Sequence, residues 1–179
     1  MNVLLIITGS IAAYKSLEII RELKIRKHNL QCVLSRGGEK FVTPLSVSSL
    51  SCTATYTEND LFSESGMSHI CLPRNSDFIL VAPASADIMA KTAHGICDEL
   101  ATSVLMAASV PILMAPAMNT VMWNSPAMQR NLSILKKDNI HIIEPECGSL
   151  ACGEVGIGKM AKVEDIVKCV EALYQRENG

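Results

Sequence analysis

The sequence predicts an α/β fold in which helices cover both faces of a doubly wound parallel sheet, giving three layers. Short, continuous apolar runs recur along the chain, as in strands that are buried on both faces. Amphipathic segments of helical length separate these runs. Strands that alternate with helices in this way pair in parallel through right-handed crossovers.

Each element follows from its own pattern. Residues 3–8 form an apolar run that ends in a Thr-Gly-Ser turn, which predicts a buried strand and a tight turn. Residues 11–27 place apolar side chains on one face and three cations near the carboxyl end, which predicts a helix. Further strands are predicted at 30–35, 78–82, 110–114 and 140–143, and further helices at 86–94, 98–108, 126–137 and from 163 onward. Residues 43–75 show no clear periodicity, so we expect long loops and short elements there.

Length and composition predict one domain over residues 1–179. Of the 179 residues, 49% are hydrophobic and 19% are charged, which suits a well-buried core. The net charge of −2 gives no indication of nucleic-acid binding. We find no signal peptide or membrane span, and the seven cysteines form no CxxC motif, so we expect reduced thiols in a cytoplasmic protein that binds no membrane. His141, Cys147 and Cys152 match no standard zinc spacing, and no metal is expected.

The unusual sequences of the chain follow the predicted strands, where open parallel sheets bind their ligands. Gly9-Ser10-Ile11 lies between a strand and a helix, where free backbone N–H groups favour a phosphate. The chain has neither GxGxxG nor GxxxxGK[ST], so a single phosphate, as in a mononucleotide, fits best. The alternative is that Ser10 is an ordinary helix cap.

Three further segments are candidates for binding. Ser35-Arg36-Gly37 and Ser85-Ala86-Asp87 follow two other strands, either as plain helix caps or as parts of the same site. The segment 116–123 holds the only Trp of the chain. Its Asn119 amide could bind a polar group of a substrate and Met122 could form an apolar wall, unless the segment only fills a gap.

Two reactive side chains remain ambiguous when each is considered alone. His69 is a lone histidine, and such residues are more often structural or exposed than catalytic. Cys152 lies in the glycine-rich segment 148–158, which predicts a mobile flap, although a lone Cys there could equally be a buried filler.

Six segments in a fixed order carry a resemblance to a known family. They are Gly9–Lys15 (GSIAAYK), Ser68–Ile70 (SHI), Pro83–Ile88 (PASADI), Lys91–Glu99 (KTAHGICDE), Pro116–Trp123 (PAMNTVMW) and Leu150–Met160 (LACGEVGIGKM). Together they resemble the homo-oligomeric flavin-containing cysteine decarboxylases, and within them the phosphopantothenoylcysteine decarboxylases of coenzyme A synthesis. The resemblance covers nearly the whole chain. It implies a flavodoxin-like, Rossmann-like fold, with FMN at the carboxyl edge of the sheet. It also implies a homotrimer or homododecamer with the active site at a subunit contact.

The resemblance assigns roles to particular residues. The positions that match FMN-binding residues are Gly9, Ser10, Ile11, Ser35, Arg36, Gly37, Ser85, Ala86, Asp87, Ile88 and Ala117. The positions that match substrate-binding residues are Asn119, Met122, Ser149, Leu150 and Ala151. The catalytic positions are His69, as an acid–base group, and Cys152, in a clamp over the substrate.

The implied reaction converts the small molecule 4′-phosphopantothenoylcysteine to 4′-phosphopantetheine. Simple loss of carbon dioxide would leave an unstabilised carbanion, and no side chain offers an electron sink, so a cofactor is required. In the family, flavin oxidises the thiol carbon to a thioaldehyde, decarboxylation gives an enethiolate, and re-reduction with a proton from Cys152 gives the product. Asn119 would orient the carboxylate, and His69 would move protons in the first half.

Two departures from the family and three rival functions stand beside this expectation. The family usually has Asn where Asp87 stands, and an added carboxylate opposes flavin reduction unless it is paired or protonated. Arg36 and the Gly37-Gly38 pair also replace a more usual segment.

The rival functions are those of a peptidyl-cysteine decarboxylase, a flavin prenyltransferase and a non-catalytic regulatory flavoprotein that binds phosphatase subunits. Many bacteria fuse this domain to a synthetase, so the chain is expected to be either a standalone enzyme or one domain of such a fusion.

Overall fold

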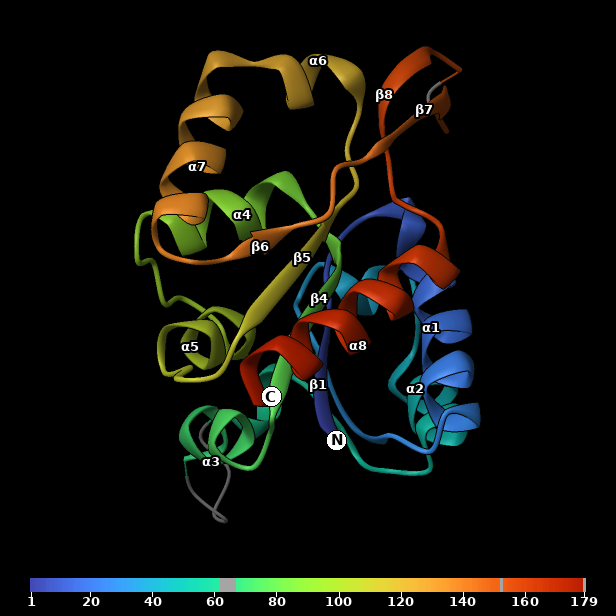
Figure 1. The fold of residues 1–179 in the computed structure, drawn as a ribbon, viewed down its shortest axis with the longest axis vertical. Coiled ribbons are helices and arrows are strands. Elements are labelled where there is room, and N and C mark those ends of the chain that lie inside the picture. The colour runs from blue at the N-terminus through green and yellow to red at the C-terminus, as the bar shows by residue number, and fades with distance from the viewer. Residues whose placement is uncertain (62–66, 152, 179) are drawn as a thin grey trace.

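A computed structural model describes residues 1–61, 67–151 and 153–178, and its centre is a six-stranded parallel sheet (Figure 1). The strand order is β3-β2-β1-β4-β5-β6: β2 and β3 are added on one side of β1, and β4, β5 and β6 on the other. The strands are β1 (Asn2–Ile7), β2 (Asn29–Leu34), β3 (Thr55–Tyr56), β4 (Phe78–Ala84), β5 (Ile112–Pro116) and β6 (His141–Ile142). Every pairing in this sheet is parallel, which confirms the predicted doubly wound architecture.

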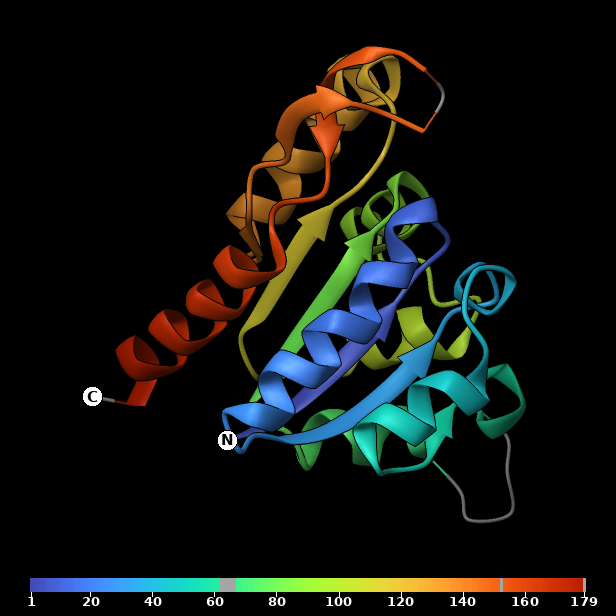
Figure 2. The same cartoon turned by 90° about the vertical axis from the view of Figure 1, so that its right-hand side faces the viewer.

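Helices cover both faces of the sheet (Figure 2). They are α1 (Tyr14–Ile25), α2 (Pro44–Ser51), α3 (Ser68–Arg74), α4 (Ala86–Ala93), α5 (Leu100–Met106), α6 (Thr120–Asn124), α7 (Pro126–Lys137) and α8 (Val163–Asn178). Short 3₁₀ helices occupy Ile11–Ala13, Gly38–Lys40 and Glu58–Asp60. A separate antiparallel hairpin consists of β7 (Glu146–Ser149) and β8 (Val155–Lys159).

The alternation of side chains along β1 separates two hydrophobic cores. Leu5 and Ile7 face one core, which α1, α2 and α8 complete with side chains such as Ile20. Leu4 and Ile6 face the other core, which α3, α4, α5 and α7 complete. Since successive residues of a strand point to opposite faces, a strand buried on both faces has to be apolar at every position.

Most predicted elements are confirmed, and the differences lie mainly in the weakly patterned regions. Helix α7 has the predicted bounds, while α5 is two residues shorter at each end than the predicted helix 98–108. Residues 43–75 hold short elements, as expected, namely α2, β3 and α3. Helix α6 begins inside the segment 116–123 and ends at Asn124, and the glycine-rich segment 148–158 overlaps both β7 and β8.

Within the described ranges, no helix is both long enough and apolar enough to cross a membrane.

Candidate functional site

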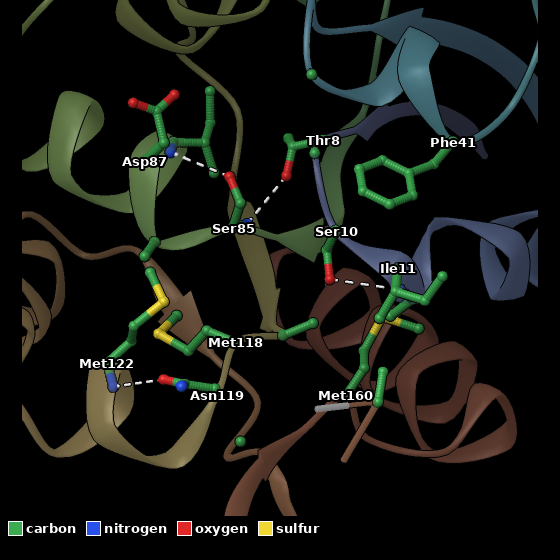
Figure 3. A pocket seen from close by; sticks show the side chains of 18 of the residues that line it. Thr8, Ser10, Ile11, Phe41, Ser85, Asp87, Met118, Asn119, Met122 and Met160 are labelled. Carbon is green, nitrogen blue, oxygen red and sulfur yellow. Dashed lines mark hydrogen bonds between the residues drawn. The ribbon is translucent and has the colours of Figure 1, made fainter. Parts of the chain in front are cut away.

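A cavity of about 630 Å³ lies at the carboxyl ends of the central strands, with the β7–β8 hairpin on one side (Figure 3). This size falls within the usual range of small-molecule and cofactor sites. All predicted cofactor residues except Arg36 line this cavity, and so do all five predicted substrate residues.

Thr8 joins the ends of two central strands beneath the cavity. Its hydroxyl donates a hydrogen bond to the carbonyl of Pro83 at 2.7 Å and accepts one from the N–H of Ser85 at 2.9 Å. Thr8 is almost fully buried, so both bonds form in a low-dielectric setting where they are strong. The end of β1 is therefore held in register with the end of β4.

Gly9 and Gly37 leave bare backbone between the ends of β1 and β2. A Cβ built on Gly9 would lie 3.0 Å from the Cα of Gly37, and a Cβ on Gly37 would lie 3.0 Å from the Cα of Gly9. Backbone atoms cannot rotate away as a flexible side chain can, so a Cβ at either position would push the facing backbone outward by a few tenths of an ångström. A flat ligand can approach the main chain closely at such a place.

Three serines at the strand ends accept backbone N–H groups of the turns that follow them. The hydroxyl of Ser10 accepts the N–H of Ala12 at 3.3 Å, that of Ser85 accepts the N–H of Ile88 at 3.3 Å, and that of Ser35 accepts the N–H of Gly38 at 3.0 Å. The capping interpretation therefore holds for Ser10 and Ser85, whereas the N-cap of the 3₁₀ helix after Ser35 is Gly37; all three serines line the cavity.

Donors at these turns remain available to a ligand. In the parts of the chain that the structure describes, the N–H groups of Ile11, Ala86 and Asp87 have no hydrogen-bond partner. Ala86 and Asp87 open α4, whose amino end carries partial positive charge. These donors fit an anionic or carbonyl-bearing ligand.

Asn119 precedes α6 and is oriented by it. Its Oδ1 accepts the N–H of Met122 at 2.8 Å (Figure 3), so the amide oxygen is engaged by the protein. No partner of its Nδ2 occurs among the described residues. The two N–H donors of the Asn119 amide are therefore available to a group in the cavity.

The hairpin reaches the cavity through close backbone contacts. The carbonyl of Gly158 accepts the N–H of Met118 at 3.0 Å, and Gly156 leaves room for the side chain of Thr120. Ser149, Leu150 and Ala151 at the tip of β7 line the cavity. Cys152, the predicted clamp cysteine, lies outside the described residues.

Arg36 points to protein groups rather than into the cavity. Its guanidinium donates to Glu58 Oε1 at 2.8 Å and to the carbonyl of Asp98 at 2.7 Å. Its backbone N–H donates to Glu99 Oε2 at 2.8 Å. Arg36 therefore ties the loop after β2 to the start of α5.

Asp87 has a cationic partner. Lys91 Nζ lies 3.1 Å from Asp87 Oδ2 and 3.1 Å from Asp98 Oδ2. Desolvation lowers the pKa of Lys91, but the two hydrogen bonds outweigh it and the pKa is raised; the bond from Lys91 lowers the pKa of Asp98. The Asp87 carboxylate also points away from the other labelled side chains of the cavity (Figure 3). The carboxylate that departs from the family pattern is thus paired.

His69 does not line the cavity. It lies in α3, at the end of the molecule opposite to the hairpin (Figure 1). Its Nδ1 is buried and has no hydrogen-bond partner among the described residues. The single chain therefore does not bring His69 together with Asn119.

Several cavity residues were not assigned a role in the sequence interpretation. Glu99 is 4% exposed, and burial raises the pKa of its carboxyl group above the ordinary value. Two lysines and four large side chains also line the cavity; they are Lys15, Lys159, Tyr14, Phe41, Met118 and Met160. All of these except Phe41 lie within the quoted segments, so their membership of these motifs was the signal that could have indicated them.

Comparison with known proteins places this geometry in a family. The family model described as Flavoprotein matches residues 1–175. The chain is 41% identical to the coenzyme A biosynthesis bifunctional protein CoaBC of Bacillus subtilis, over 99% of this chain and 44% of that protein. It therefore spans less than half the length of that relative. It is 36% identical to a probable phosphopantothenoylcysteine decarboxylase of Streptococcus mutans, over 95% of this chain and 97% of that protein.

Solved structures agree with this placement. A mutant PPC decarboxylase in complex with pantothenoylaminoethenethiol has a TM-score of 0.89 and 32% identity, covering 97% of this chain and 98% of that one. The FMN-binding protein AtHal3 has a TM-score of 0.85 and 33% identity, covering 98% of this chain and 97% of that one.

Proposed function

The chain belongs to the Flavoprotein family, and from this premise we propose that it is an FMN-dependent decarboxylase acting on 4′-phosphopantothenoylcysteine in coenzyme A synthesis. The product is 4′-phosphopantetheine. Similarity to the Streptococcus mutans protein over nearly its whole length supports this activity. The proposal covers decarboxylation alone, because the chain matches 44% of the bifunctional relative.

The cavity fits FMN. Gly9 and Gly37 form a backbone floor that any Cβ would obstruct, and the N–H groups of Ile11, Ala86 and Asp87 are available to anionic or carbonyl oxygens. These residues, with Ser10, Ser35, Ile88 and Ala117, would hold the cofactor. When bound, FMN supplies a two-electron acceptor that takes up and later returns the electrons of the thiol carbon.

The orientation of Asn119 is the observation that carries the proposal. Because the Asn119 Oδ1 is engaged by the Met122 N–H, the amide presents its N–H donors to the substrate carboxylate. A neutral donor pair holds this anion without over-stabilising a charge that disappears with carbon dioxide. Met122, which is 48% exposed, and Leu150 at the tip of β7 would cover the reacting carbon from water.

We infer that a second copy of the chain supplies His69. The residue lines no part of the cavity within one chain, and its Nδ1 is buried without a partner. Exposed apolar side chains lie close to α3 and α5, among them Met67 and Met106. Such exposed side chains fit a subunit contact in a homotrimer or a homododecamer. There the His69 imidazole would take and deliver the substrate protons.

Cys152 is proposed as the donor of the last proton. Residues 149–151, which directly precede it in the sequence, line the cavity and support this role. The six cysteines in the described part of the chain carry free thiols, which fits the reducing conditions of the cytoplasm.

Anaerobic incubation of the purified yellow protein with 4′-phosphopantothenoylcysteine tests the proposal. Mass spectrometry should detect carbon dioxide and a product lighter by that mass. The Cys152→Ser variant should still release carbon dioxide but accumulate the oxidised enethiol. Bound flavin without turnover would overturn the assigned activity, and turnover of a peptide with a carboxy-terminal cysteine instead would favour the peptidyl-cysteine alternative.

A further inference from the structure

The charged residues that line the cavity are two carboxylates, which have protein partners, and two lysines, which have no carboxylate partner in the described part of the chain. Asp87 forms an ion pair with Lys91, and Glu99 accepts the backbone N–H of Arg36. The cations are Lys15 and Lys159. Within the described residues, neither lysine lies within 4.0 Å of a carboxylate oxygen, so both ammonium groups are available to an anionic ligand.

Lys159 lies on the hairpin, beside the residues proposed to contact the substrate. It is the last residue of β8, and its side chain extends across Gly148 in β7. Its Nζ is 3.8 Å from the position that a Cβ on Gly148 would take. The ammonium group therefore lies next to the start of the segment 149–151. A larger residue at 148 would crowd the lysine, whose Cδ would lie 3.3 Å from the new Cβ.

The one carboxylate opposite Lys159 does not engage it. Glu146 is the cross-strand neighbour of Lys159 in the antiparallel pairing. No ion pair of 4.0 Å or less joins these two described residues. Glu146 therefore does not neutralise the ammonium group of Lys159.

Lys15 lies on a different wall of the cavity. It is the second residue of α1, which continues the turn formed by Gly9, Ser10 and Ile11. The available N–H of Ile11 belongs to the same turn. Lys15 therefore lies beside the turn expected to hold the phosphate of the cofactor, whereas Lys159 lies beside the residues proposed to contact the substrate.

We propose that Lys159 determines specificity by binding the phosphate monoester of the substrate. The inference rests on the proposed function and names the group that recognises the second anionic end of that substrate. The carboxylate end meets the neutral amide of Asn119, which leaves the phosphate to be recognised by a cation. A lysine ammonium is a compact point charge that suits a phosphate dianion. A peptide with a carboxy-terminal cysteine has no such group, so the hairpin lysine favours the small phosphorylated substrate.

The test compares two substrates that differ only in the phosphate, 4′-phosphopantothenoylcysteine and pantothenoylcysteine, on the FMN-loaded protein. The Lys159→Met variant keeps the length of the side chain and removes its charge. We expect its KM for the phosphorylated compound to rise about tenfold, since a hydrogen bond to a charged partner is lost at a partly solvated site. The KM for pantothenoylcysteine should stay within about twofold. Lys162→Met, at an exposed lysine outside the cavity, is the matched control and should change neither value.

Two further measurements locate the effect. The dissociation constants of the products, 4′-phosphopantetheine and pantetheine, measured by calorimetry, should show the same selective loss in Lys159→Met. Raising the salt concentration should weaken the wild-type preference for the phosphorylated compound and leave the variant unchanged. The FMN dissociation constant should be the same in the wild-type protein and in Lys159→Met.

Three outcomes would overturn the inference, and one of them separates it from the proposed function. Equal KM changes for both substrates would show that Lys159 does not recognise the phosphate. A KM increase for the phosphorylated substrate alone in Lys15→Met, and not in Lys159→Met, would show that Lys15 binds the substrate phosphate instead. Turnover of neither substrate by the wild-type protein would overturn the proposed function together with the inference that rests on it.

Discussion

The two halves of the site are built differently. The cofactor half consists of strand ends in the middle of the sheet, where Thr8, Ser35 and Ser85 are all less than 10% exposed and hydrogen-bonded within one chain. The proposed substrate half consists of peripheral parts. Asn119 precedes the short helix α6, residues 149–151 lie at the hairpin, and His69 lies on α3 at the far end of the molecule (Figure 1).

This difference indicates which half is complete in a single chain. The cofactor half is preorganised by the same backbone pairing that stabilises the sheet, so it should bind FMN without help. In the proposed assembly, the substrate half would become complete when a second copy places His69 near Asn119. Flavin binding and turnover should therefore respond to different substitutions.

The largest effect is expected from His69→Asn. Loss of a general acid–base group lowers the rate by about 10²–10⁴-fold. FMN absorbance and affinity should stay at the wild-type level, because α3 is remote from the cofactor half. Steady-state kinetics and fluorescence titration of FMN measure the two effects separately.

Subunit mixing sharpens this result. His69→Asn and Asn119→Ala chains, each inactive alone, should recover measurable activity after they are unfolded and refolded together. Recovery is expected because a mixed oligomer contains some sites with both residues intact. If the mixture stays inactive while it binds FMN and assembles normally, the two residues do not meet across a subunit contact.

A smaller effect is expected from Gly37→Ala. The new Cβ would lie 3.0 Å from the Cα of Gly9, and backbone must move to relieve the contact. We expect the FMN dissociation constant to rise about tenfold, in line with a cost of about 1–3 kcal/mol for overpacking. Gly148→Ala is the control, because its Cβ meets only the flexible side chain of Lys159. Equal FMN affinities in both variants would contradict the role of the glycine floor.

Lys91→Met should shift the flavin reduction potential modestly. Without the ammonium group, the Asp87 carboxylate is left uncompensated on the cofactor side. The potential should fall by no more than about 30 mV, a tenfold change in a two-electron equilibrium, since the Asp87 side chain is 66% exposed and screened. Redox titration of Lys91→Met with Asp87→Asn should return the potential towards the wild-type value. No recovery in the double variant would show that Asp87 does not act on the flavin.

The smallest effect is a change in the pH dependence of stability through Glu99. Burial raises the pKa of Glu99 in the folded protein above its ordinary value of 4.5. Its contribution to stability is full below pH 4.5, where both states bind the proton, and is lost as pH rises through the folded pKa. Glu99→Gln has no proton to lose, so its melting temperature should gain on the wild type as pH rises through this window. Parallel pH curves for the two proteins would contradict the raised pKa.

Much of the fold was already determined by local sequence patterns. The apolar runs at residues 3–8 and 78–82 correspond to β1 and β4, because a strand covered on both faces requires apolar side chains throughout. Helix α2 carried a signal that was not used, since Thr43 and Ser46 form a capping box around Pro44. Helix α3 offered no such signal, as it begins after Met67 in a left-handed conformation and contains Pro73.

The sequence by itself determined the strands, the turns that follow them and the motif residues of the cavity, because these depend on side-chain periodicity and on backbone groups near in the chain. Only the tertiary structure decided the direction of Arg36 and the position of Lys159 across Gly148. These depend on contacts between separate elements, and no local pattern encodes which residues will meet. The separation of His69 from Asn119 is of the same kind, since a single chain places Asn119 at the cavity and the helix α3, which carries His69, at the opposite end of the molecule. The pairing of Asp87 with Lys91 is different, because the two residues stand four apart in one helix and their spacing already favours it.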